Sequence, residues 1–179
     1  ALVIKAIKQS AGSGRTIIGG VNELSTGATI EATRAAADSG AEAALVITPY
    51  FYKSSMTHTA LTRFYNDVAD RAPIPVLIYN VPQNTGVVID SAAIASLAEH
   101  QNIIGVKDSS GNMAAISDTI SRTPPGFSVM TGNGGILYPS LRPGLWNERE
   151  AHHKVAQAVL RSSLIDRVRL RRYRRWIDQ

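Results

Sequence analysis

The chain has 179 residues, the size of one globular domain, with 44% hydrophobic residues and 18% charged residues. This composition and a formal net charge of +5 argue against an intrinsically disordered protein. No apolar run reaches the roughly 18 residues that a membrane helix needs, and the absence of cysteine excludes a disulfide framework and a thiolate metal site.

The uneven distribution of charge predicts two parts of the chain. Residues 1–141 contain 9 Lys and Arg against 10 Asp and Glu, a net charge of −1. Residues 142–179 contain 10 Lys and Arg against 4 Asp and Glu, a net charge of +6. We therefore predict a domain over 1–141 and a basic, helical tail over 142–179. The near-neutral first part is not typical of a nucleic-acid-binding domain.

Five short apolar runs recur along the first part, and their starts lie 29, 31, 28 and 25 residues apart. Runs of this kind are typical of strands buried on both faces of a parallel sheet. The predicted strands are 15–19, 44–48, 75–79, 103–107 and 128–132. Helical patterns fill the gaps between them, at 26–39, 57–71, 92–100 and 112–122. Gly40 is a helix stop after the first of these, and Asp90 or Ser91 caps the third.

This alternation of strands and helices predicts an α/β fold with two possible architectures, a doubly wound sheet or a (β/α)8 barrel. The steady spacing favours the barrel, of which about five of eight β/α units are visible in the sequence. No GxGxxG or Walker pattern opens a helix, which weakens the nucleotide-binding alternative.

Lys107 and Tyr79 are the most informative residues, because catalytic groups of α/β folds gather at the carboxyl ends of strands. A buried lysine amine there can form a Schiff base with a carbonyl substrate. Tyr79 ends the preceding strand 28 residues earlier, so we expect it beside Lys107 at similar depth, where a phenol can transfer a proton. The alternatives are a solvent-facing lysine paired with Asp108 and a tyrosine that merely ends its strand.

Other polar patterns carry weaker signals. None of the four histidines has other possible metal ligands near it at a spacing that suits a metal site, so we expect no metal site. No serine lies in a GxSxG motif, so we expect no serine nucleophile. The glycine-rich residues 132–135 could bind an anion or form a flexible turn.

Three ordered strings resemble one known family. TPYFYK (48–53), YNVPQNTG (79–86) and GVKDSSGN (105–112) are similar to motifs of the dihydrodipicolinate synthase/N-acetylneuraminate lyase family of class I pyruvate aldolases. The resemblance covers about residues 15–141. It implies a TIM barrel, a homo-oligomer, pyruvate or a related 2-oxo acid as substrate, no cofactor, and neither a membrane nor a nucleic acid as partner.

The resemblance also implies roles for individual residues. Lys107 matches the Schiff-base lysine, and Tyr79 matches the tyrosine that shuttles protons. The residues that it places around the substrate are Thr48, Tyr50, Asn84 and Gly132.

Two departures distinguish the chain within that family. Phe51 stands where dihydrodipicolinate synthases usually have a second tyrosine, and Asn84 stands where they usually have an arginine that binds the second substrate's carboxylate. The string YNVPQNTG with Asn84 looks closer to 4-hydroxy-2-oxoglutarate aldolase-like members. The family's Gly-Thr-Thr turn is not found ahead of the first strand, so we expect a truncated barrel.

The tail shows no resemblance to the family, and residues 150–176 could form a helix with six arginines near its end. Such a helix could bind RNA or a membrane surface, or it could be a solvated face or out-of-frame sequence. Three functional hypotheses follow: a Schiff-base lyase or aldolase, a catalytically inactive fragment of the same fold, and nucleic-acid binding through the tail. We expect a cytoplasmic or mitochondrial location.

Overall fold

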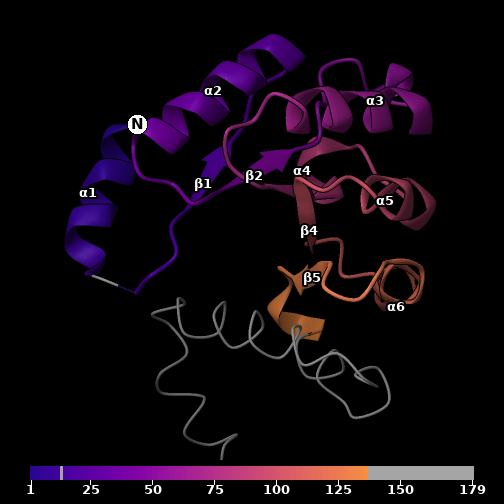
Figure 1. The fold of residues 1–179 in the computed structure, drawn as a ribbon. Coiled ribbons are helices and arrows are strands. Elements are labelled where there is room, and N and C mark those ends of the chain that lie inside the picture. The colour runs from indigo at the N-terminus through magenta and orange to yellow at the C-terminus, as the bar shows by residue number, and fades with distance from the viewer. Residues whose placement is uncertain (13, 137–179) are drawn as a thin grey trace, which may run out of the picture.

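The computed structural model describes residues 1–12 and 14–136 of the chain. Within these ranges five strands form one sheet in which every neighbouring pair is parallel, and their spatial order follows the chain order (Figure 1). The strands are β1 (Ile18–Val21), β2 (Ala43–Ile47), β3 (Val76–Asn80), β4 (Ile103–Asp108) and β5 (Ser128–Thr131).

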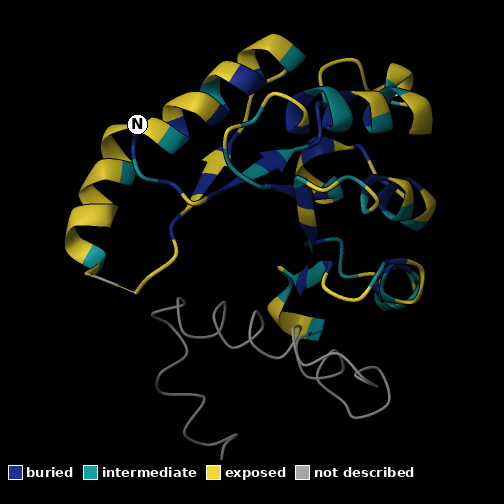
Figure 2. Ribbon diagram, viewed as in Figure 1, coloured by how far each residue is buried: buried dark blue, intermediate teal, exposed yellow. Residues whose placement is uncertain are grey.

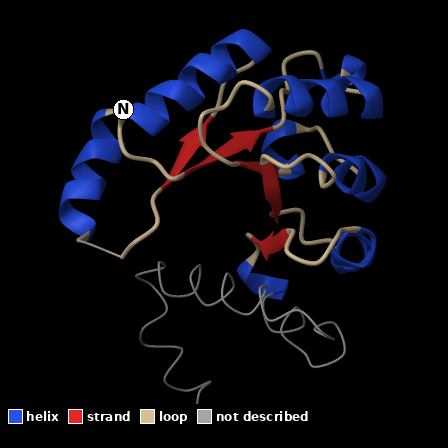
Figure 3. Ribbon diagram, in the orientation of Figure 1, coloured by secondary structure: helices blue, strands red, loops and turns tan. Residues whose placement is uncertain are grey.

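Helices alternate with the strands and cover the outer side of the sheet (Figure 3). The α-helices are α1 (Leu2–Ala11), α2 (Thr26–Asp38), α3 (His58–Ala69), α4 (Pro82–Thr85), α5 (Ser91–Leu97) and α6 (Met113–Arg122). Two short 3₁₀ helices are η1 (Lys53–Ser55) and η2 (Gly134–Ile136). No helix in the described ranges is long and apolar enough to cross a membrane.

The arrangement decides between the two architectures that the sequence left open. Helix α2 contacts α3, α3 contacts α5, and α5 contacts α6, so these four helices form a row on one face of the sheet (Figure 1). A doubly wound sheet reverses its strand order and carries helices on both faces, whereas an arc of a barrel does neither. The described part of the chain is therefore a five-stranded arc of a (β/α)8 barrel, as the spacing predicted.

Side chains cap the four helices of that row, which explains why each begins where it does. Ser25, Thr57, Asp90 and Asn112 each accept a hydrogen bond from the backbone N–H three residues later, over 2.7–3.3 Å. This is the usual N-cap arrangement, and it selects Asp90 over Ser91 as the cap of α5. Gly40 follows α2 with a φ of 96°, which confirms it as the residue that stops this helix.

The main core lies between the sheet and the row of helices, where Figure 2 shows buried residues along the strands. Val46, Ile78 and Val106 pack there with the apolar sides of α3 and α5. Tyr65 of α3 is fully buried, and its hydroxyl donates a hydrogen bond to the carbonyl oxygen of Val46 over 3.0 Å. Leu77 alternates with Ile78 and belongs to a smaller cluster on the opposite, inner face of the sheet.

The structure differs from the sequence prediction in three places. The first strand is Ile18–Val21 and not 15–19, because pairing with β2 holds two glycines of low strand propensity in the extended conformation. Residues 82–85, where no helix was predicted, form the short helix α4, whose first residue is a proline. Helix α1, which the sequence did not predict, has no buried residue. The predicted tail helix and the boundary after residue 141 lie outside the described residues.

Candidate active site

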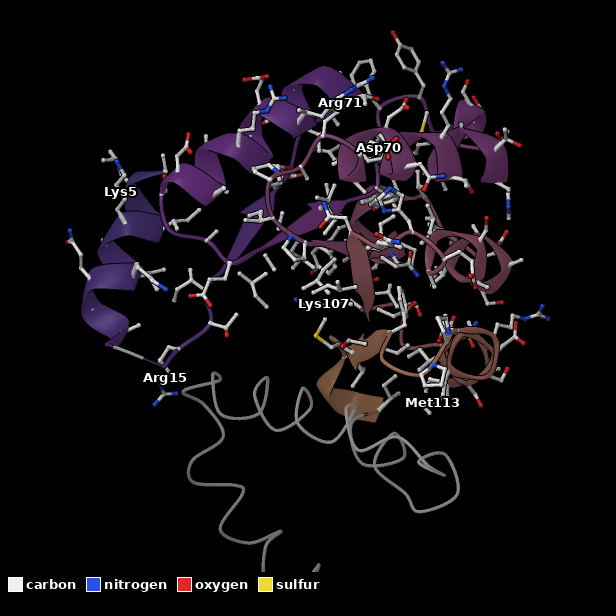
Figure 4. The ribbon with its side chains drawn as sticks, viewed as in Figure 1. Lys5, Arg15, Asp70, Arg71, Lys107 and Met113 are labelled. Atoms are coloured by element: carbon white, nitrogen blue, oxygen red, sulfur yellow. The ribbon has the colours of Figure 1, made fainter. Side chains whose placement is uncertain are left out.

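A row of four side chains crosses the inner face of the sheet at one level. Ile47, Tyr79, Lys107 and Met130 are register partners on β2, β3, β4 and β5. Met130 belongs to the inner apolar cluster with Leu77, so the row faces away from the helices. In Figure 4, Lys107 lies on the side of β4 away from α5 and α6.

Lys107 and Tyr79 are in direct contact within this row. The Lys107 Nζ lies over the Tyr79 ring, 4.5 Å from the ring centroid, and both residues are half-buried. An ammonium group at this distance interacts favourably with the face of an aromatic ring. The prediction that the two residues stand on adjacent strands at similar depth is confirmed, and the spacing of 28 residues was its signal.

The alternative pairing of Lys107 with Asp108 is wrong. Successive strand residues point to opposite faces, and the buried Asp108 carboxylate is bound elsewhere. It accepts hydrogen bonds from Asn80 Nδ2 over 2.7 Å, from the Ser110 backbone N–H over 2.8 Å, and from the Ser110 hydroxyl. Among the described residues no carboxylate forms an ion pair with Lys107.

The sequence reasoning missed this Asp108 network, although one signal was present. Asn80 and Asp108 are separated by the same 28 residues as the neighbouring pair of Tyr79 and Lys107. One repeat of the fold therefore brings two adjacent pairs together, one on each face of the sheet.

Gly132 lies directly beside the lysine, at the end of β5. A Cβ placed on it would overlap the Ser109 hydroxyl and lie 2.9 Å from Lys107 Cε. Its backbone N–H donates to the Asp108 carbonyl oxygen over 2.7 Å, which holds the two strand ends together. Gly132 is thus a close-approach glycine, and Ser109 is a second neighbour of the lysine that the sequence analysis did not assign.

Among the described residues, no hydrogen bond, ion pair or ring contact joins the other three expected substrate residues to Lys107. Thr48 is fully buried after β2, and its hydroxyl has no hydrogen-bond partner among the described residues. Tyr50 is half-buried and packs against the main core. Asn84 is exposed on α4, where its neighbour Gln83 donates to the Ser109 carbonyl oxygen over 2.9 Å. Their roles therefore remain predictions.

No cluster of three His, Cys, Asp or Glu side chains suited to a metal ion occurs within the described ranges. The two described histidines each face one aspartate: His58 lies 3.4 Å from Asp90, and His100 lies 3.1 Å from Asp70. A surface hollow lined by His58, Arg63 and Asp67 lies on the solvent side of α3, so it is separate from the lysine.

The fold and the site together define a barrel-type α/β scaffold whose strand ends carry a lysine amine stacked on a phenol. The family model described as "Dihydrodipicolinate synthetase family" matches residues 1–158. The chain belongs to this family. The match confirms the resemblance read from the three strings and extends beyond the range of 15–141 on both sides.

Individual relatives agree with the family assignment. The chain is 36% identical over 143 residues to a 4-hydroxy-tetrahydrodipicolinate synthase of Exiguobacterium, covering 80% of this chain and 48% of the relative. A dihydrodipicolinate synthase structure from Aquifex aeolicus aligns with a TM-score of 0.71 and 34% identity, over 77% of this chain and 47% of that one. A chloride-inhibited enzyme from Acinetobacter baumannii, complexed with pyruvate, aligns with a TM-score of 0.69 and 37% identity, over 73% and 44%. The chain thus spans about half the length of the relatives that it matches.

Proposed function

We propose that the chain carries the imine-forming centre of a class I lyase or aldolase that acts on pyruvate or on 2-oxo acids that yield pyruvate. The observation that carries this proposal is the contact of the Lys107 amine with the Tyr79 ring on the inner face of the sheet. An amine nucleophile and a proton-transferring phenol are the two groups that imine chemistry needs side by side.

The chemistry follows from these two groups. The Lys107 amine adds to the keto carbon of pyruvate, and the resulting carbinolamine loses water to give an iminium ion. Tyr79 is placed to protonate the departing hydroxyl group. The iminium ion withdraws electrons, so the neighbouring methyl carbon can release a proton to the Tyr79 phenolate and form an enamine. The enamine attacks an aldehyde to form a carbon–carbon bond, and the aldehyde oxygen takes the proton back from Tyr79. Water then adds to the iminium ion and releases the product and the free Lys107 amine; cleavage is the same sequence reversed.

The comparisons support the substrate class. The related enzyme of Acinetobacter baumannii is described as complexed with pyruvate, and the relatives carry the name of a synthase. No cofactor is needed, because the lysine itself supplies the electron-withdrawing iminium group. The homo-oligomer that the resemblance implies stays a prediction, which analytical ultracentrifugation of the full chain tests.

Within this class, we propose cleavage of a 4-hydroxy-2-oxo acid as the reaction. Phe51 has a phenyl ring that cannot relay a proton, and it is 70% exposed and in edge contact with the exposed Tyr52. Asn84 offers an uncharged amide for substrate binding. The test is to incubate the chain with 4-hydroxy-2-oxoglutarate and to measure the release of pyruvate with a coupled assay. Absence of release from a chain that still forms the pyruvate imine would contradict it.

The central experiment is reductive trapping of the imine. The full chain is incubated with pyruvate and borohydride, and the modified lysine is located by intact mass and peptide mapping. We expect one reduced pyruvyl group on Lys107, with Lys5, Lys8 and Lys53 as internal controls because all three are exposed. A folded chain that gains no pyruvyl group, or gains it equally on all lysines, would refute the proposal and favour the inactive alternative.

A further inference from the structure

We propose that Asp108 and Asn80 form a positioning clamp that holds the Lys107 amine over the Tyr79 ring. The catalytic part of this inference rests on the proposed function, whereas the geometric part does not. Asn80 and Asp108 are register partners on β3 and β4, one residue beyond Tyr79 and Lys107. Their side chains therefore lie on the opposite face of the same two strands from Lys107, which is labelled in Figure 4.

The Asp108 carboxylate is buried and held by hydrogen bonds. Asp108 is 5% exposed, and no cation pairs with it among the described residues. A buried charge of this kind needs compensation. Hydrogen bonds from Asn80 Nδ2 and from the backbone and hydroxyl of Ser110 supply it. The carboxylate is therefore held by donors in fixed directions, which also fixes the strand end that carries it.

The side chain of Asn80 has no freedom to turn. Its side-chain oxygen accepts a hydrogen bond from the Ile89 backbone N–H over 3.4 Å, while its side-chain nitrogen donates to Asp108. Its backbone carbonyl oxygen accepts from the Ser109 N–H over 2.8 Å. Rotating the amide would break two bonds at once, so the orientation of Asn80 is determined from both sides.

The clamp joins the ends of three strands. The Asp108 side chain is bound to β3, and its backbone carbonyl oxygen accepts the Gly132 N–H at the end of β5 over 2.7 Å. Tyr79, Lys107 and Gly132 each lie next to one of these bonds. The clamp touches no reacting atom, so it acts by placing the lysine and the phenol, and not as a catalytic residue.

The swapped double variant Asn80→Asp/Asp108→Asn provides the decisive comparison. In Asp108→Asn alone, the new amide nitrogen either faces the Asn80 nitrogen or faces the donors of Ser110. In both orientations two donors face each other, so a hydrogen bond of the clamp is lost. In the swap, the amide introduced at position 108 donates to the carboxylate introduced at position 80, and its oxygen accepts from Ser110. The carboxylate at position 80 also accepts from Ile89, so every hydrogen bond of the clamp is restored.

The first readout needs no pyruvate. Lys107 Nζ lies over the face of the Tyr79 ring, so we expect the ring current to shift the NMR resonances of the protons on the adjoining Cε upfield. In the full chain labelled with lysine ¹³C at Cε, we expect this shift in the unsubstituted protein, its loss in Asp108→Asn, and its return in the swap. Asp118→Asn is the matched control, because Asp118 also accepts from a serine hydroxyl, Ser91, but lies on α6.

The second readout is the limiting rate of reductive trapping at saturating pyruvate. A displacement of about 1 Å at a reacting centre costs on the order of 10²-fold in rate, so we expect Asp108→Asn to lower the limiting rate by at least about tenfold. The swap should regain most of this loss. Should Asp108→Asn fail to fold, Ser110→Ala, which removes one donor, replaces it in both measurements.

The two readouts separate the clamp from the proposed function. A ring-current shift without trapping in the unsubstituted chain would overturn the proposed function and leave the clamp as a purely geometric device. Retention of the shift in a folded Asp108→Asn variant would overturn the clamp, as would a folded swap that regains neither shift nor rate.

Discussion

Replacing Gly132 with alanine is the sharpest single perturbation of the site, because it adds one carbon atom beside the lysine. The new Cβ would overlap the Ser109 hydroxyl and approach Lys107 Cε to 2.9 Å and Ser109 Cβ to 3.2 Å. The hydroxyl can rotate away about its own side-chain bond, but Ser109 Cβ is fixed to the backbone. The strain is therefore relieved mainly by moving the lysine side chain.

The structure allows both the stability and the rate effect of Gly132→Ala to be bounded. Off-rotamer strain of a side chain costs about 0.5–1.5 kcal/mol, so we expect a loss of about 1 kcal/mol in the free energy of unfolding. For a chain of this size that lowers Tm by about 2–4 °C. The reaction is more sensitive, because misplacing a reacting group by about 1 Å costs on the order of 10²-fold in rate.

The assay pairs thermal unfolding, followed by far-ultraviolet circular dichroism, with the rate of pyruvate trapping by borohydride. Gly134→Ala is the matched control, since a Cβ at Gly134 would meet nothing within 4 Å. We expect the control to behave like the unsubstituted chain in both measurements. If Gly132→Ala trapped pyruvate as fast as Gly134→Ala, the close approach of Gly132 to Lys107 would have no role in imine formation.

Two further predictions concern stability. Tyr65→Phe removes the buried hydroxyl that donates to the Val46 carbonyl oxygen. We therefore expect a loss of about 1 kcal/mol in the free energy of unfolding, measured by urea denaturation. An unchanged free energy would show that this hydrogen bond does not stabilise the fold. Hydrogen bonds from Ser91 and Arg122 lower the pKa of Asp118 below its usual value. The stability that this carboxylate contributes is therefore present above its unfolded-state pKa and is lost as pH falls through the lower, folded-state value. Asp118→Asn should flatten the acid side of the stability–pH curve, and an unaltered curve would contradict the argument.

The sequence predicted the elements whose signals are repeated along the chain. Apolar runs at nearly constant intervals indicated all five strands, with the first displaced by three residues at its start. The same interval placed Tyr79 beside Lys107, because residues one repeat apart occupy equivalent positions on neighbouring strands. The expected cap at Asp90 or Ser91 located the start of α5, since an N-cap is a local hydrogen bond that needs no tertiary context.

What the sequence could not show depends on tertiary contacts without a local signal. The bond between Asn80 and Asp108 joins two polar residues that ordinary patterns treat as strand ends. The crowding at Gly132 depends on how the end of β5 approaches Ser109, a distance that no spacing rule gives. The orientation of Lys107 was undecided for the same reason, because only the inner cluster with Met130 shows which face of the sheet it occupies.

The alternation of strand residues gives β4 two separate tasks at adjacent positions. Lys107 presents its amine to the inner face, where the neighbouring side chains of the row and Gly132 limit its position. Asp108 faces the other way and binds β3 through its side chain and the end of β5 through its carbonyl oxygen. A substitution on either face therefore displaces the lysine, but Gly132→Ala does so by direct contact, whereas Asp108→Asn does so through the strand ends. Both kinds of variant should therefore alter the lysine resonance before any pyruvate is added, but only the effect of Asp108→Asn should be reversed by the swap with Asn80→Asp; recovery of the resonance in Gly132→Ala by the same swap would contradict this distinction.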